Sequence, residues 1–348
     1  EDGSQDRIEK GLQWLGNNFT VANNPNFANR YHLYYMYALE RAGRLTGRRY
    51  IGGHDWYREG SEQLLQLQAI PGGKFQARGI EEGNDFTETA FALLFLSKGK
   101  RQTLISRLQY DSSLAQDWNH HSVAIQHLTA HTEQAWKRDL SWQNVDIDRS
   151  TVKELLETPV LFISGTRIPR WTDRHKQLLK DYVNQGGFLF VEGCNCSGCN
   201  GTEFENYFRN FVVDVFEQPL EKLSPDHPIW FAESRVNPGD LPDNAWIYGV
   251  QTCCRLGIVY VPYSLSCRWE LNSPFGIRGQ FNEEVQSDLD TATKIGLNVL
   301  AYATGKELKE KLDTVTVLEE VADRTPTDRG VFFLPKLRHN AGFDDAPK

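Results

Sequence analysis

Six cysteines give this sequence its most concentrated group of reactive side chains. All of them lie between residues 194 and 267, and the first half of the chain has none. The six are Cys194, Cys196, Cys199, Cys253, Cys254 and Cys267. Clustering of this kind indicates a local staple or a local site rather than thiols scattered through a core.

Three chemical states of these cysteines stay open. Four thiolates of the set could hold a structural zinc ion, although the usual ribbon has two C-x2-C pairs and this chain has one, at Cys196 and Cys199. Disulfides are the second alternative, and they would favour an extracytoplasmic location. Free thiols are the third. No cofactor other than a structural zinc is predicted.

Three histidines offer a second candidate metal site. At helical spacing, His120, His127 and His131 fall within about 40° of one another on a helix predicted over residues 117–136. Imidazole nitrogens in that arrangement could bind a transition metal. A partly solvated helix face is the alternative interpretation, and no metal is predicted there.

The elements that must position these residues alternate along the chain. Residues 103–110 alternate in polarity as a strand does, and residues 160–163 and 188–191 are continuous apolar runs, as in strands buried on both faces. A helix between the last two strands is predicted to begin after Thr172 as its cap. Strands and helices in alternation with short connections predict a three-layer α/β sandwich around a mostly parallel sheet.

In an open parallel sheet, ligands bind beyond the carboxyl ends of the strands. Two predicted loops leave such ends, and their candidate ligand residues are Ser164, Gly165, Thr166 and Arg167 in one and Gly193 and Asn195 in the other. The backbone amides of these loops, together with Arg167, could hold a small anion or polar ligand. The alternative is that the glycines serve only the tight turns.

Several short motifs occur together in the same region, at residues 162–165, 182–192, 225–229, 254–255, 260–269 and 296–305. Together they resemble the domain of unknown function 4159 family, bacterial domains related in fold to class I glutamine amidotransferases. The resemblance covers residues 103–305 and implies a flavodoxin-like or amidotransferase-like sandwich. No reaction is established for the family, so the resemblance implies a fold and little chemistry.

The amidotransferase resemblance implies a possible role for Cys194. In that fold the nucleophilic cysteine follows a strand such as residues 188–191, and Cys194 lies nearest this position. A thiolate there would attack a carboxamide and form a thioester. The Gly-x-Cys-x-Gly elbow is absent, and neither His227 nor His339 provides a His–Glu partner. The family pattern also implies that a disulfide would join Cys194 or Cys196 to Cys254 or Cys267.

Residues 1–98 predict helical hairpins, with residues 86–96 apolar nearly all round, as in a buried helix. Two units of roughly 45 residues indicate a helical repeat. Residues 35–43, 55–57, 68–75 and 89–96 resemble α/α-toroid repeats of the prenyltransferase and squalene-cyclase superfamily. The aspartate-rich motif of one branch and the zinc cysteine of the other are missing. The resemblance therefore implies a partial, non-catalytic toroid.

The end of the chain is predicted to hold two further segments. Residues 306–329 are rich in charge and are predicted to form a helix and a linker. Residues 330–348 echo the segment that begins at residue 104, and we expect them to start a second copy of the α/β domain. This repeat, with a first residue other than methionine, predicts that the chain is an internal fragment of a larger protein.

Composition narrows the classes of function. The net charge of -8 and the lack of a basic stripe argue against a nucleic-acid partner. No apolar run approaches the roughly 18 residues of a membrane helix. The predicted function is a non-catalytic, extracytoplasmic binding or scaffold protein whose protein or small-molecule partner is unknown. The alternative is a cysteine-dependent amidase or amidotransferase that uses Cys194.

Overall fold

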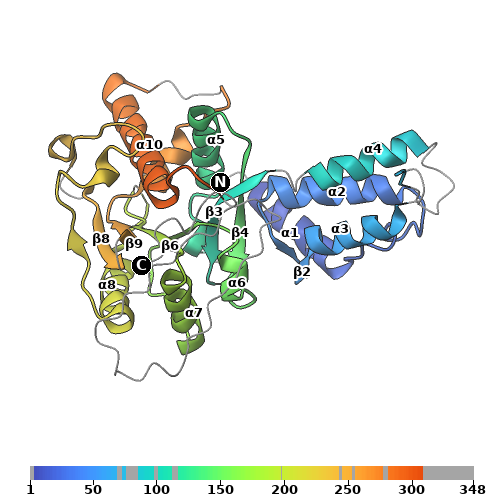
Figure 1. Cartoon of the computed structure of the whole chain (residues 1–348), viewed down its shortest axis with the longest axis horizontal. Helices are drawn as coiled ribbons and strands as arrows, with labels where there is room; N and C mark the ends of the chain where they lie inside the picture. Colours follow the sequence, from blue (N-terminus) through green and yellow to red (C-terminus); the bar gives the residue numbers. More distant parts are fainter. Residues whose placement is uncertain are drawn as a thin grey trace, which may run out of the picture. The chain divides into compact units, whose positions relative to one another are not determined.

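The computed structural model of the chain is drawn in Figure 1. It describes residues 4–68, 73–75, 85–97, 101–111, 117–196, 198–242, 245–252, 255–276 and 281–308. Residues 1–316 form one compact unit, and residues 317–348 form a second. The second unit, and with it the predicted second copy at residues 330–348, lies outside the described residues, as does most of the predicted charged linker.

The N-terminal part is built from helices and one short hairpin. Its elements are α1 (Ser4–Asn17), α2 (His32–Leu45), β1 (Tyr50–Ile51), β2 (His54–Asp55), α3 (Trp56–Leu67) and α4 (Asp85–Leu96). Asp55 caps the start of helix α3, because its side chain accepts a hydrogen bond from the Arg58 amide. Fully buried Trp56, Met36 and Phe95 centre the core of this part.

The prediction that residues 86–96 form a helix buried all round is wrong in one respect. Helix α4 exists, and Ala92 and Phe95 on it are fully buried. Phe86, Leu93 and Leu94, however, are 79%, 56% and 46% exposed. The apolar composition of the helix therefore does not show which of its faces pack against a neighbouring element.

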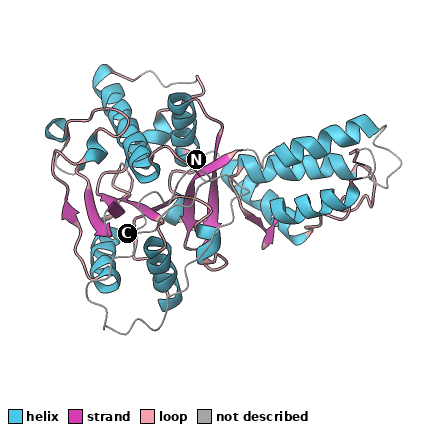
Figure 2. Cartoon of the chain, in the orientation of Figure 1, coloured by secondary structure: helices cyan, strands magenta, loops and turns pink. Residues whose placement is uncertain are grey.

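The α/β part contains one seven-stranded sheet, visible edge-on in Figure 2. Its strands are β3 (Gln102–Gln109), β4 (Leu140–Asp146), β5 (Val160–Gly165), β6 (Phe188–Gly193), β7 (Glu221–Lys222), β8 (Tyr248–Thr252) and β9 (Arg255–Val261). The strand order is β4-β3-β5-β6-β9-β8-β7. The first five in this order are parallel, and β8 and β7 run antiparallel to their neighbours. The sheet is therefore mostly parallel, as the alternating pattern predicts.

Helices cover both faces of this sheet. The α-helices of this part are α5 (Ala124–Trp136), α6 (Val152–Leu155), α7 (Asp173–Asn184), α8 (Thr202–Phe216), α9 (Leu265–Leu271) and α10 (Glu283–Thr304). Helices α5, α9 and α10 share one core with Phe162 and Phe190 of the central strands. Helices α6, α7 and α8 share the opposite core with Ile163 and Val191. Every residue of β5 and β6 is buried, as expected for strands covered on both faces.

The predicted helix over residues 117–136 is broken at its start. Residues Asp117–Asn119 form a short 3₁₀ helix, η2, and α5 begins only at Ala124. Two further short turns of this kind, η3 (Pro228–Trp230) and η4 (Pro238–Asp240), lie before β8. The predicted cap of α7 is confirmed, because Thr172 forms a capping box with His175.

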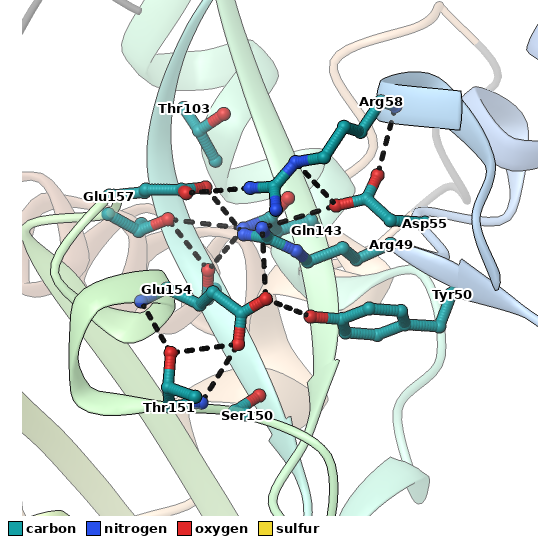
Figure 3. A network of polar contacts seen from close by, with 12 residues as sticks. Arg49, Tyr50, Asp55, Arg58, Thr103, Gln143, Ser150, Thr151, Glu154 and Glu157 are labelled. Atoms are coloured by element: carbon teal, nitrogen blue, oxygen red, sulfur yellow. Dashed lines mark hydrogen bonds and ion pairs between the residues drawn. The ribbon is translucent and has the colours of Figure 1, made fainter. Parts of the chain in front are cut away.

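The N-terminal part meets the sheet at its outer strand, β4. The backbone of Asn144 donates to the Gly47 carbonyl at 2.5 Å and accepts from the Arg49 amide at 3.3 Å. Beside it, buried Arg49 pairs with Glu157 at 2.6 Å and with Asp55 at 3.3 Å, and Figure 3 shows this network. The edge of the sheet is thereby covered rather than left open to another chain.

Candidate metal centre

The cysteine loop lies where an open α/β sheet places its ligands. Gly193 ends β6, and the loop from Cys194 to Cys199 follows it directly. The segments after β3 and β9, which hold His121 and α9, meet this loop through their side chains. All three follow the carboxyl ends of parallel strands, the edge at which such sheets bind ligands.

One histidine and three cysteines converge at this edge. The ligand atoms of His121, Cys194, Cys196 and Cys199 all lie within 4.8 Å of one another. His121 Nε2 is 3.5 Å from the Cys194 sulfur and 3.4 Å from the Cys196 sulfur. These four described cysteine and histidine side chains therefore share a space of the size that one metal ion occupies.

The two distances between His121 Nε2 and the cysteine sulfurs match those between ligands of a tetrahedral zinc ion. With zinc–sulfur bonds near 2.3 Å and zinc–nitrogen bonds near 2.0 Å, a sulfur and a nitrogen ligand lie about 3.5 Å apart.

The other nitrogen of His121 is already engaged. Nδ1 donates to the carboxylate of Glu270 at 2.8 Å, and Glu270 lies on α9. Burial lowers the pKa of His121, but the Glu270 hydrogen bond and charge outweigh it, so that the pKa is raised overall. A histidine that donates through Nδ1 to a carboxylate and presents Nε2 to its neighbours has the usual arrangement of a metal-bound imidazole.

The three thiols differ in burial and in acidity. Cys194 is fully buried, and burial, with the nearby Cys199 and Glu192, raises its pKa strongly. Cys196 is partly exposed, and contacts with Cys267 and His121 lower its pKa despite its burial. Burial also raises the pKa of Cys199. Three thiols held this close together suit a site at which a cation would replace their protons.

Backbone contacts fix the shape of the cysteine loop. The Cys194 amide donates to the Gly165 carbonyl at 3.0 Å, and the Cys199 amide donates to the Cys196 carbonyl at 2.9 Å. Asn195 bridges the loop, because its side chain donates to the Pro262 carbonyl and accepts from the Gly201 amide. A side chain on Gly201 would place its Cβ 2.8 Å from the Cys194 nitrogen, so this position requires glycine.

A layer of buried polar side chains lies beneath the cluster. Glu192, the residue before Gly193, is fully buried and accepts hydrogen bonds from Ser164 at 2.9 Å and from the Ser266 amide at 2.9 Å. Arg107 of β3 is also buried and donates to the His121 carbonyl at 2.9 Å. Burial lowers the pKa of Arg107 to about 10, although the charges of Glu192 and Glu270 oppose this. This layer fixes both the start of the cysteine loop and the backbone of His121.

The chain matches the family described as "Domain of unknown function (DUF4159)" over residues 104–304, more than half of its length. The chain belongs to this family. No curated protein matches the chain. The cysteine cluster, His121 and α9 all lie inside the DUF4159 domain.

The DUF4159 domain brings together only part of the predicted cysteine set. Cys194, Cys196 and Cys199 converge, and Cys267 interacts with Cys196. These four described cysteines are free thiols, so the structure holds no disulfide among them. Cys253 and Cys254 lie outside the described residues.

The predicted ligand crevice contains a side chain of the domain itself. The amides of Thr166 and Arg167 donate to the carboxylate of Asp117 at 3.1 and 3.2 Å. These hydrogen bonds and His120 lower the pKa of Asp117 far below its usual range, although burial opposes them. Ser164 turns inward to Glu192, and Asn195 holds the loop. The amides expected to bind an anion therefore have an internal carboxylate as their partner.

The predicted three-histidine face does not form. His120 lies before α5 and pairs with Asp117 at 3.0 Å, whereas His127 and His131 bond to the carbonyls of Trp269 and Asn272 at 2.9 and 2.8 Å. The helical spacing failed because the chain is not helical at residue 120, and the other two rings are used to join α5 to the α9 segment.

The residues that sequence reasoning missed are His121 and Glu270. His121 was assigned to a helix that begins three residues later, at Ala124, and Glu270 is separated from it by 149 positions. The one available signal was the pair of adjacent histidines at residues 120–121, in the segment that follows the predicted strand at residues 103–110, because such segments lie at the ligand edge of the sheet.

Proposed function

We propose that this protein is a non-catalytic zinc-binding protein in which His121, Cys194, Cys196 and Cys199 hold one structural zinc ion. The observation that carries the proposal is the approach of two cysteine sulfurs to the same nitrogen of His121, at 3.4 and 3.5 Å. Three thiolates and one imidazole form a closed set of four ligands, which is the usual composition of a structural zinc site.

The ligand set defines what the ion would do in the fold. His121 follows β3, and the three cysteines follow β6, so a bound ion would tie together two loops that are separated by 73 positions between His121 and Cys194. Glu270 of α9 would keep the proton of His121 on Nδ1. The ion would supply a cross-link and no reaction, because four protein ligands leave no position for a substrate.

The experiment compares two cysteine variants of the full chain. Protein purified with reductant and then freed of excess metal is analysed for zinc by mass spectrometry. Wild type and Cys267→Ser should each hold about one zinc per chain, because Cys267 lies outside the four-ligand set. Cys199→Ser should lose most of it. Equal zinc content in the two variants would contradict the ligand assignment.

A cysteine-dependent hydrolase is the second candidate, and one observation favours it. Cys196, His121 and Glu270 follow one another as nucleophile, base and orienting carboxylate would, at 3.4 and 2.8 Å. In this alternative the nucleophile is Cys196, because Cys194, predicted for this role, is fully buried and has a strongly raised pKa. Fast stoichiometric alkylation of Cys196 in zinc-loaded protein would support the hydrolase over the structural site.

The finer predictions from resemblance remain proposals. The resemblances to a partial, non-catalytic toroid and to an amidotransferase-like fold favour a binding or scaffold role for an unknown partner. Among the described residues, no helix is long and apolar enough to cross a membrane. The extracytoplasmic location stays a prediction, and fractionation of the native cells with an antibody to this protein would test it.

A further inference from the structure

A fifth sulfur lies beside the cluster without belonging to it. Cys267 is in the first turn of α9 and interacts with Cys196 through its side chain. It is one helical turn from Glu270, which holds His121, so both side chains lie on the same face of the helix. Helix α9 therefore presents two side chains to the cluster. The carboxylate of Glu270 orients His121, and the thiol of Cys267 lies outside the four-ligand set.

The pair of Cys196 and Cys267 is more accessible than buried Cys194, and Cys199 is partly exposed as well. Cys196 and Cys267 are both partly exposed, whereas Cys194 is fully buried. An oxidant from solvent can reach Cys196, and a nearby thiol is in place to resolve the product.

We infer that Cys196 and Cys267 form a redox-sensitive pair, whose oxidation to a disulfide removes Cys196 from the zinc site. The inference rests on the proposed zinc function, and it adds a modification site and a means of regulation. The oxidant class is a peroxide, because a thiolate attacks the O–O bond of such a molecule directly.

The reaction proceeds in two balanced steps. The Cys196 thiolate attacks one oxygen of hydrogen peroxide, an S–O bond forms, the O–O bond breaks, and hydroxide leaves; Cys196 is now a sulfenic acid. The Cys267 thiol then attacks the sulfenic sulfur, an S–S bond forms, and the sulfenic oxygen leaves as water with the proton of the Cys267 thiol. Two electrons pass from the two sulfurs to the peroxide.

Loss of Cys196 leaves three of the four ligands, namely His121, Cys194 and Cys199. Structural sites depend on all four, so the ion should leave the protein when the disulfide forms. A thiol reductant should cleave the disulfide and restore the site, which distinguishes this change from irreversible oxidation to a sulfinic acid.

The test uses the full chain loaded with one equivalent of zinc and treated with hydrogen peroxide. Zinc release is followed with the colorimetric chelator 4-(2-pyridylazo)resorcinol, and disulfides are mapped by mass spectrometry after trypsin digestion without reductant. Cleavage after Lys180, Arg209, Arg255 and Arg268 places Cys267 in the peptide of residues 256–268, apart from the peptide of residues 181–209 that holds Cys194, Cys196 and Cys199. Fragmentation of the linked pair identifies the partner.

We expect wild type to release zinc together with a 196–267 disulfide, and Cys267→Ser to release it at least about tenfold more slowly, since its sulfenic acid lacks this resolving thiol. Equal release rates, or a disulfide confined to residues 181–209, would overturn the redox pair and leave the zinc site intact. Failure of both proteins to take up zinc before peroxide is added would instead overturn the zinc proposal on which the pair depends.

Discussion

His121 is bonded on both sides of its ring, and this double engagement sets the chemistry of its surroundings. Nδ1 bonds to the Glu270 carboxylate, so Nε2 is the ring nitrogen that faces the two sulfurs. Arg107 holds the backbone of the same residue through its carbonyl. A ring that is fixed in both tautomer and position loses little entropy when it binds a metal, which favours tight binding.

Removal of the Glu270 carboxylate should weaken the site without removing a ligand. Glu270→Gln keeps the size of the side chain but loses the charge that supports the Nδ1 proton. We expect its zinc affinity to fall by about 10- to 100-fold, as for other outer carboxylates of this kind. Competition with a chelator of known affinity measures this change. Glu284→Gln, an exposed change in α10, is the matched control, and an equal loss there would contradict the role of Glu270.

Asp117 should govern part of the acid sensitivity of the fold. Its carboxylate accepts from Tyr110 at 3.0 Å and from the amides of Thr166 and Arg167, and its pKa is far below the usual value. Below about pH 4 the unfolded chain therefore takes up a proton that the folded chain does not, so stability falls as the pH drops toward the native pKa.

The variant Asp117→Asn isolates this contribution. An amide cannot replace a carboxylate that accepts from several donors at once, so we expect a loss of about 2 kcal/mol in the free energy of unfolding at pH 7. The difference between wild type and variant should shrink as the pH falls below about 4. Urea denaturation at several pH values measures both effects. A difference that stays constant with pH would show that the Asp117 charge is not involved.

Some of the strands and helices can be predicted from the sequence, and others cannot. The continuous apolar runs at residues 160–163 and 188–191 identify β5 and β6, because only strands covered on both faces are apolar at every position. The two-residue strand β7 has no such pattern and was missed. Helix α4 was found as an element, but its exposed face depends on which neighbours pack against it, and a single segment does not encode that.

The same distinction holds for the site. The cysteine loop after β6 could be placed at the ligand edge, because the end of a buried strand is visible in the sequence. His121 could not be joined to it, since it lies 73 positions before Cys194 and meets it only through the strand order of the sheet. Tertiary proximity of this kind leaves no local signal.

In the contacts between elements, Arg49 should contribute more to the free energy of unfolding than its neighbour Arg58. The Arg49 side chain is 6% exposed and contacts Glu157 and Asp55, whereas Arg58 is 56% exposed. We expect Arg49→Ala to cost about 2 kcal/mol in the free energy of unfolding, since it removes a buried side chain together with its ion pairs to the partly exposed carboxylates of Glu157 and Asp55. Arg58→Ala should cost less than about 1 kcal/mol. Chemical denaturation of both variants measures the contrast, and similar losses would contradict a special role for the buried arginine.

At the scale of the molecule, a bound ion would couple the cysteine loop to the stability of the whole α/β part. An ion that binds only the folded chain adds about 4 kcal/mol when its concentration is 1,000 times the dissociation constant. For a domain of this size, that gain corresponds to a rise of about 10 °C in Tm. A strong chelator should therefore lower Tm by a similar amount in wild type and by little in Cys199→Ser, as calorimetry would show.

The most direct test of the zinc site is the coordination of the metal itself. X-ray absorption at the zinc edge, recorded on full chain purified with reductant, counts the sulfur and nitrogen neighbours of the ion. The account predicts three sulfur ligands at about 2.3 Å and one nitrogen at about 2.0 Å, with the nitrogen lost in His121→Ala. A shell of oxygen and nitrogen alone, or protein that holds no zinc while all its thiols are reduced, would contradict it.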